Sequence, residues 1–119
     1  MISDEKLRKK ERLLKSGDFR IVFKEGRSAK AGALILYARP NGLGYNRLGF
    51  SIAARNIKLA ARRNKIKRVL KEVFRRGKAS LKKGFDLVVV AKRDVARASS
   101  YDSLKNLFVE LTKRTGLAL

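Results

Sequence analysis

The sequence predicts one α+β domain, a two-layer sandwich of helices on a four-stranded sheet. Short segments with strand character precede and follow one long segment of helical periodicity, and a second helical segment ends the chain. The 119 residues are 45% hydrophobic, which suffices for one modest core. No repeat, low-complexity tract or change of composition divides the chain, so we treat residues 1–119 as a single domain.

The first fifteen residues are basic, with six cations and three acids, and their leucines are too sparse to define a helix face. We expect residues 1–15 to form a mobile basic arm. Its last residues would dock Leu13 and Leu14 on the domain.

A short helix is expected over residues 17–25, with Ser16 as its N-cap and Gly26 at its end. Phe19 and Phe23 lie four residues apart and therefore share one face. Two phenylalanines at this spacing are most often core residues. In a protein this basic, a partly open ring could instead stack on a nucleic-acid base.

Four segments have strand character. Residues 33–39 and 47–53 alternate in polarity, and the Pro40-Asn41-Gly42 turn between them predicts that the second strand returns antiparallel to the first, as in a hairpin. A small strand near 27–30 would precede them. The continuous apolar run over 85–91 is typical of a strand buried on both faces.

The segment 55–76 is the most informative, because it holds ten cations and a single acid. Its apolar residues nevertheless keep the spacing of one helix face. They are Leu59, Ile66, Leu70 and Val73, with Val69 and Phe74 beside them. The adjoining face presents, in angular order, Arg63, Lys67, Lys71, Asn64, Arg75 and Arg68. One face can pack on a sheet while the other offers a row of hydrogen-bond donors.

The ends of this helix also carry signals. Asn56 is the expected N-cap and Gly77 the expected residue of positive φ after the last turn. Glu72 lies four residues from both Arg68 and Arg76 and could orient their guanidinium groups. A charge run is often only a solvated helix face, but here acids scarcely interrupt the cations, which favours a polyanionic partner.

The last helix is expected to begin near Ser99 or Ser100 and to end at Gly116. If Ser99 is the N-cap, Asp102 takes the third helical position of a capping box. Its apolar stripe consists of Leu104, Leu107, Phe108 and Leu111. The connection over 92–98 is the one candidate for a loose loop.

The composition limits the classes of function that the chain can have. The net charge of +21 favours nucleic acid as the partner. The chain has no cysteine and no histidine, which removes disulfides, the commonest zinc ligands and the usual proton shuttle. No apolar run reaches the roughly 20 residues of a membrane span, and the first residues are charged where a signal peptide would be apolar. We expect a cytoplasmic protein with no membrane partner.

The string RRNKIKRVLKEVFRR at 62–76 resembles the Arg-Asn-Arg motif of the protein subunit of bacterial ribonuclease P, and AARNIKLAA at 53–61 also fits it. The likeness continues in LKSGDFRIVF at 14–23, LILYAR at 34–39, RLGFSIA at 47–53 and FDLVVVAKRDV at 85–95. Nearly the whole chain is covered, in order. Two positions depart from the motif: Ala54 replaces one of two consecutive cations, and Lys65 replaces the second Arg and loses its bidentate geometry.

The resemblance implies the order α-β-β-β-α-β-α, a mixed sheet and a left-handed crossover between two parallel neighbouring strands, as in the second domain of a small-subunit ribosomal protein. It also implies partnership with a catalytic RNA, one protein per RNA, that removes the 5′ leader of precursor transfer RNA. With the charge of the helix, it predicts that the RNA subunit is bound by Arg55, Lys58, Arg62, Arg63, Asn64, Lys65, Lys67, Arg68, Lys71 and Arg75. The residues that match the family's leader-binding cleft are Phe19, Phe23 and Tyr37, with Ser51 and Lys67 near its wall.

Catalysis by the protein itself is not expected. Phosphodiester cleavage needs a general base or a carboxylate cluster for metal ions, and the ten acids are scattered with no pair at a strand end. The resemblance implies that the RNA carries the active site and, with the substrate, holds the Mg²⁺. The alternatives are a structural RNA-binding protein of ribosomal type and, less favoured, a nucleoid-type DNA-binding protein.

Overall fold

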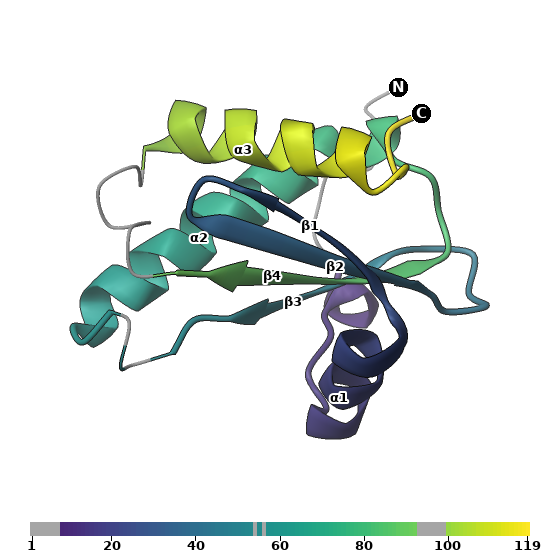
Figure 1. The fold of residues 1–119 in the computed structure, drawn as a ribbon, viewed down its shortest axis with the longest axis horizontal. Coiled ribbons are helices and arrows are strands. Elements are labelled where there is room, and N and C mark those ends of the chain that lie inside the picture. Colours follow the sequence, from purple (N-terminus) through teal and green to yellow (C-terminus); the bar gives the residue numbers. More distant parts are fainter. Residues whose placement is uncertain (1–7, 54, 56, 93–99) are drawn as a thin grey trace.

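The structure is a computed structural model, which describes residues 8–53, 55, 57–92 and 100–119. Its elements are α1 (Ser16–Glu25), β1 (Arg27–Ala31), β2 (Leu34–Pro40), β3 (Arg47–Ser51), α2 (Ala60–Gly77), β4 (Phe85–Ala91) and α3 (Tyr101–Arg114), with 3₁₀ turns at Lys9–Glu11 and Lys78–Ser80. Figure 1 shows this order along the chain, and it is the order that the sequence predicts.

The sheet is mixed, and its strand order is β1-β2-β4-β3. Strand β4 pairs antiparallel with β2 and parallel with β3. Strands β2 and β3 therefore run in opposite directions, as predicted, but the hairpin pairing is wrong because β4 lies between them. In this interior position both faces of the run over 85–91 are buried, and this burial explains why β4 lies between β2 and β3.

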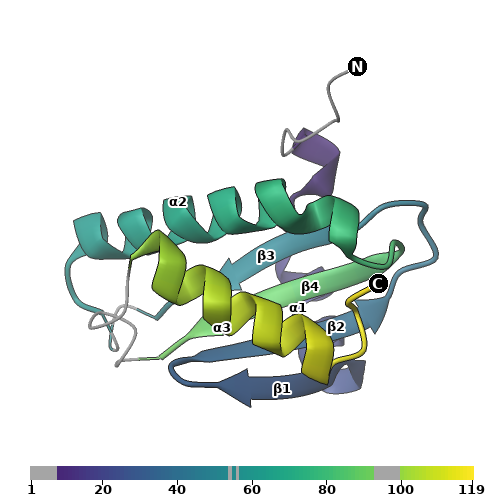
Figure 2. The same cartoon turned by 90° about the horizontal axis from the view of Figure 1, so that it is seen from above.

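Helix α2 connects the parallel neighbours β3 and β4 by a left-handed crossover. Figure 2 shows the sheet from the side that α2 covers. Both strands point to the left, and the chain moves down from β3 to β4 as it passes through the helix in front, which is the left-handed sense. Most crossovers of this kind are right-handed. The crossover places α2 along the β3 side of the sheet, while α3 crosses toward β1.

The main core lies between the sheet and the pair α2 and α3, which gives the predicted two-layer sandwich. Figure 1 shows these two helices on one face and α1 on the other. A smaller cluster of Leu13, Val22 and Val88 lies under α1. Along β4, Val88 points to this cluster while Leu87 and Val89 point to the main core, so the prediction of burial on both faces is confirmed.

Several predicted helix ends differ from the structure. Ser16 is the first residue of α1, and Lys15 stands at the N-cap. Helix α2 begins at Ala60, so Leu59 is its N-cap and is 59% exposed instead of belonging to the apolar stripe. Gly77 has φ −103° and the chain continues into a 3₁₀ turn, so it does not need the left-handed region. Asn56 lies outside the described residues.

The N-cap of helix α3 is Ser100, the second of the two serines that the sequence offered for it. The Oγ of Ser100 accepts a hydrogen bond from the backbone N–H of Ser103 at 3.2 Å. Ser99, and residues 93–98 of the expected loose loop, lie outside the described residues. Gly116 has φ +78° and follows the last turn, as the sequence indicates.

The described part of the basic N-terminal segment is packed against the domain. The backbone N–H of Leu13 donates to the carbonyl of Leu48 in β3 at 2.8 Å, and Leu13 is 2% exposed. Glu11 is buried and pairs with Lys78 at 3.1 Å. Docking of Leu13 is therefore confirmed, whereas Leu14 is 71% exposed and does not dock. Residues 1–7 lie outside the described residues.

Candidate RNA-binding site

Helix α2 presents two different sides beside its buried stripe. One side faces α3, because Val69 packs on the main core and the Arg76 guanidinium lies 5.5 Å from the ring centroid of Tyr101. Helical spacing puts Arg62 and Lys65 on this side. The other side faces the β3 edge, because Lys78 pairs there with the N-terminal segment. We call the residues on it the basic row: Arg63, Asn64, Lys67, Arg68, Lys71 and Arg75.

Exposure within the predicted RNA-binding set follows this geometry. Arg55, Lys58, Arg62, Asn64, Lys65 and Arg68 are exposed, whereas Arg63, Lys67, Lys71 and Arg75 are half-buried. Long cationic side chains can bury their stems and still present charged heads. The structure thus brings the row together on one surface, with Arg55 and Lys58 on the segment that leads into the helix.

Arg63 has a structural partner that periodicity did not reveal. Its Nη1 donates to the carbonyl of Ile57 at 2.8 Å and to that of Lys58 at 3.0 Å. The N-cap residue Leu59 makes no side-chain cap hydrogen bond, and the Arg63 guanidinium instead holds the carbonyls of the segment that leads into the helix. Its remaining N–H groups are donors that could still reach a phosphate.

Glu72 orients two guanidinium groups at the carboxyl end of α2. It accepts hydrogen bonds from Arg75 and from Arg76, the latter at 2.9 Å. The hydrogen bond from Arg75, reinforced by Arg76, lowers the pKa of Glu72 to about 2. The predicted pairing with Arg76 is confirmed, and the predicted pairing with Arg68 is wrong. Among the described residues, Arg68 has no acidic partner, which leaves its fork for a ligand.

The predicted aromatic residues come together on the opposite face of the sheet. The rings of Phe23 and Tyr37 meet edge to face with centroids 4.9 Å apart, and Phe19 lies 6.5 Å from Phe23. Phe19 and Tyr37 pack partly on the smaller core, while Phe23 is 39% exposed. Both readings of these phenylalanines therefore have support, because Phe19 anchors α1 and Phe23 offers an open ring. We call Phe19, Phe23 and Tyr37 the aromatic face.

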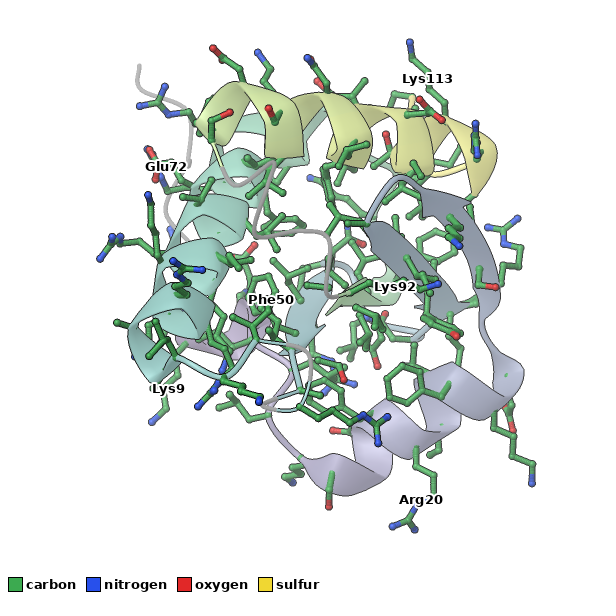
Figure 3. All side chains as sticks on the ribbon, turned by 60° about the vertical axis from the view of Figure 1, so that its left-hand side comes forward. Lys9, Arg20, Phe50, Glu72, Lys92 and Lys113 are labelled. Atoms are coloured by element: carbon green, nitrogen blue, oxygen red, sulfur yellow. The ribbon has the colours of Figure 1, made fainter. Side chains whose placement is uncertain are left out.

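The other two predicted leader residues, Ser51 and Lys67, come from different parts of the fold. Ser51 is on the sheet face that α1 covers, two residues after Gly49, whose Cα faces Phe19. Lys67 belongs to the basic row, across the β3 edge from the aromatic face. Figure 3 shows Phe50 in the interior beneath α2 and Arg20 projecting from the outer side of α1. A ligand chain would have to pass over the β3 edge to touch both surfaces.

A buried ion pair between Arg47 of β3 and Asp86 of β4, which no local sequence pattern indicated, ties the two strands together. Arg47 binds Asp86 through two hydrogen bonds of 2.7 and 2.6 Å, and Asp86 is 3% exposed. Asn41 adds a third hydrogen bond to the same carboxylate, and Asp18 of α1 lies 3.8 Å from Arg47. The bond to Asp86 raises the pKa of Arg47. No local spacing could reveal partners that are 39 residues apart.

The described carboxylates do not form a donor set for a metal ion. Most are ion-paired with Lys or Arg, namely Glu11, Asp18, Glu25, Glu72, Asp86 and Glu110. No group of three acids comes together within the described ranges. Mg²⁺ prefers several unpaired oxygen ligands, so these side chains do not fit it.

The described helices also include none long and apolar enough to cross a membrane.

Comparison with known proteins gives a consistent result. The family model of ribonuclease P matches residues 7–116. The ribonuclease P protein component of Thermotoga maritima is 41% identical over 92 residues, which cover 77% of this chain and 78% of the relative. That of Caldanaerobacter subterraneus is 36% identical over 106 residues, covering 89% and 90%.

Solved structures agree with the sequence comparisons. The RNase P protein of Thermotoga maritima superposes with a TM-score of 0.79 at 36% identity, covering 87% of this chain and 96% of that one. The RNase P protein of Staphylococcus aureus superposes with a TM-score of 0.83 at 25% identity, covering 92% and 98%. The family-model match at 7–116 includes the basic helix and all four strands.

Proposed function

This chain belongs to the family of bacterial ribonuclease P protein components, and from that premise we propose that it binds the catalytic RNA through the basic row and the 5′ leader of precursor transfer RNA through the aromatic face. Family membership makes it a subunit of ribonuclease P, a ribonucleoprotein with a catalytic RNA. The single observation that carries the finer proposal is the placement of the two surfaces on either side of the β3 edge.

The basic row suits a folded RNA. Each phosphate that a cation neutralises releases counterions, so binding should weaken steeply with salt. Arginine forks such as that of Arg68 can hold two phosphate oxygens at once. Asn64 adds a neutral donor and acceptor that could read a base edge.

The aromatic face suits a single strand. Stacking of a base on an aromatic ring is worth about 1 to 3 kcal/mol and tolerates any sequence. The leader is present in the precursor and absent from the product, so this contact would favour binding of substrate over product. Better placement of the scissile phosphate would raise the apparent affinity for Mg²⁺ indirectly.

The cleavage chemistry is assigned to the RNA. The chain offers no histidine, and its described carboxylates are engaged mainly by cations. We infer that the RNA subunit and substrate hold the Mg²⁺, that one protein binds one RNA, and that the complex works in the cytoplasm. The protein alone should not cut precursor transfer RNA.

Reconstitution tests the proposal. The protein is mixed with a bacterial ribonuclease P RNA and 5′-extended precursor transfer RNA at low Mg²⁺, beside protein alone and RNA alone. We expect cleavage at the mature 5′ end only in the mixture. Cleavage by protein alone would contradict the assignment of chemistry to the RNA. An inactive mixture, with tight binding to ribosomal RNA, would favour the structural RNA-binding alternative.

Two matched variants separate the two surfaces. Arg68→Gln should weaken binding of the RNA subunit and reduce its salt dependence, whereas Lys113→Gln, an equal charge loss on α3, should do neither. Phe23→Ala should reduce the preference for precursor over mature transfer RNA about tenfold. Ile21→Ala is the control for it, because Ile21 is 42% exposed on the far side of α1. Equal effects of the two α1 variants would refute the leader contact.

A further inference from the structure

A cavity of about 320 Å³ lies at the carboxyl end of α2, away from the aromatic face. Its walls come from the N-terminal segment, the β2–β3 loop and the turn after α2. In Figure 2 the N-terminal turn stands beside the second half of α2, at the β3 side. The lining includes Tyr45 and the cations Arg8, Lys10, Arg75, Arg76, Lys78 and Lys83.

Charge around the cavity is strongly unbalanced. Among the described residues, Glu11 is the one acid in the lining, and it is bound by Lys78 at 3.1 and 3.2 Å. Glu72 is shared between Arg75 and Arg76. Lys10 and Lys83 are exposed, and Lys83 has no acidic partner among the described residues. Because these carboxylates already engage Arg75, Arg76 and Lys78, we assign the phosphate to Lys10 and Lys83.

Tyr45 adds an aromatic surface to this positive field. Its ring is half-buried, and Lys10 Nζ lies 4.5 Å from its centroid. An exposed cation–π contact is weaker than base stacking, so a base could displace Lys10 and leave its ammonium for the phosphate. The volume is at the small end for a ligand site and suits one nucleotide.

We propose that this cavity binds one nucleotide of an RNA chain, with the base on Tyr45 and the phosphate between Lys10 and Lys83. The inference rests on the proposed RNA-binding function, but Arg75 is the only member of the basic row that lines the cavity. The contact would extend the RNA interface from α2 to the N-terminal segment and the β2–β3 loop. Those segments come together only in the folded chain.

The test uses the full chain and a bacterial ribonuclease P RNA. Ultraviolet cross-linking followed by mass spectrometry of the wild-type complex should place a nucleotide adduct on Tyr45. Tyr45→Ala should weaken RNA binding about tenfold while Tyr45→Phe, which keeps the ring, should bind as the wild type does. Lys83→Gln should reduce the slope of log affinity against log salt by about 0.7, and the neighbouring Lys82→Gln, outside the cavity, should not.

Each contrary result has a distinct meaning. Absence of the adduct together with equal binding by Tyr45→Ala and Tyr45→Phe would overturn the proposal while leaving the basic row intact. Adenosine 5′-monophosphate, titrated against the protein and followed by the Tyr45 amide resonance, tests the other source of a nucleotide. If it saturates the site while the RNA leaves Tyr45 accessible, the RNA-chain assignment is wrong. Failure of the wild-type protein to bind the RNA at all would instead overturn the proposed function.

Discussion

Gly49 shows how one missing side chain shapes the aromatic face. A Cβ at this position would lie 2.5 Å from Cζ of Phe19 and 3.1 Å from Cβ of Leu13. The Phe19 ring therefore rests directly on the backbone of β3. This contact fixes how close α1 can approach the sheet, and with it the position of Phe23 against Tyr37.

We expect Gly49→Ala to lower the free energy of unfolding by about 1 to 2 kcal/mol, because the new methyl group displaces a ring that packs against backbone. Urea denaturation measures the change. In a protein that already carries Phe19→Ala, Gly49→Ala should lower the free energy of unfolding by about 1 kcal/mol less, because the ring that the methyl group displaces is absent. Gly17→Ala is the control, because nothing lies within 4 Å of that position and alanine favours a helix. Equal costs in both backgrounds would contradict the contact.

At the scale of elements, α2 packs on the sheet with one face and, in our proposal, binds RNA with the others. Its buried stripe consists of Ile66, Leu70, Val73 and Phe74, and its polar sides hold the predicted RNA ligands. Arg63 combines a proposed role with an observed one, since it belongs to the proposed RNA-binding row and also donates to the carbonyls of Ile57 and Lys58 before the helix. Loss of binding in an Arg63 variant would therefore mix two causes.

Arg62 and Arg63 separate these causes. Arg63→Ala should lower the free energy of unfolding by about 1 kcal/mol, because two carbonyls lose a charged donor in a partly exposed place. Arg62→Ala, one residue earlier and exposed, should leave stability within about 0.5 kcal/mol. Both variants should bind the RNA subunit more weakly. Thermal denaturation and filter binding measure the two effects, and equal stability of the two variants would argue against the role of Arg63 in the helix entry.

The pKa of Glu72 predicts a pH dependence for the same helix. Its pKa falls from 4.5 to about 2 on folding, mainly through Arg75. The stabilisation is therefore complete above pH 4.5 and is lost as the pH falls toward 2. The difference in unfolding free energy between wild type and Glu72→Gln should be constant above about pH 5 and shrink below it. Taking the difference cancels the other carboxylates, and a difference that stays constant down to pH 2.5 would contradict the shift.

At the scale of the whole molecule, the net charge of +21 opposes folding, whereas it would favour binding of a polyanion such as RNA. Like charges are closer together in the folded chain than in the unfolded one. Salt screens this repulsion, because the Debye length falls from about 10 Å at 0.1 M to about 3 Å at 1 M. Salt should thus strengthen the fold and weaken the complex.

We expect the thermal midpoint of the free protein to rise on the order of 5 °C between 0.02 and 0.5 M NaCl, followed by circular dichroism. Over the same range the affinity for the RNA subunit should fall by orders of magnitude. A double variant, Lys105→Gln with Lys113→Gln, has a lower charge and should show a smaller rise. A midpoint that falls with salt would show that ion pairs, and not repulsion, dominate the electrostatics.

The sequence by itself determined how α2 and β4 are buried. The spacing of Ile66, Leu70 and Val73 separated the core side of α2 from its basic sides. The run over 85–91, apolar except for Asp86, indicated a strand covered on both faces. The same strings identified the family. Hydrophobic periodicity is a property of one stretch of sequence, so it can be recognised without knowing which other elements pack against that stretch.

Only the tertiary structure decided which elements meet. It placed β4 between β2 and β3, the segment around Leu13 on the β3 edge, and α1 on the face opposite α2. It also formed the Arg47–Asp86 pair and the cavity around Tyr45. Apolar strands of similar pattern can pair in several orders, because each pairing satisfies the same backbone hydrogen bonds. The choice depends on burial summed over segments far apart in the chain, which no single stretch of sequence contains.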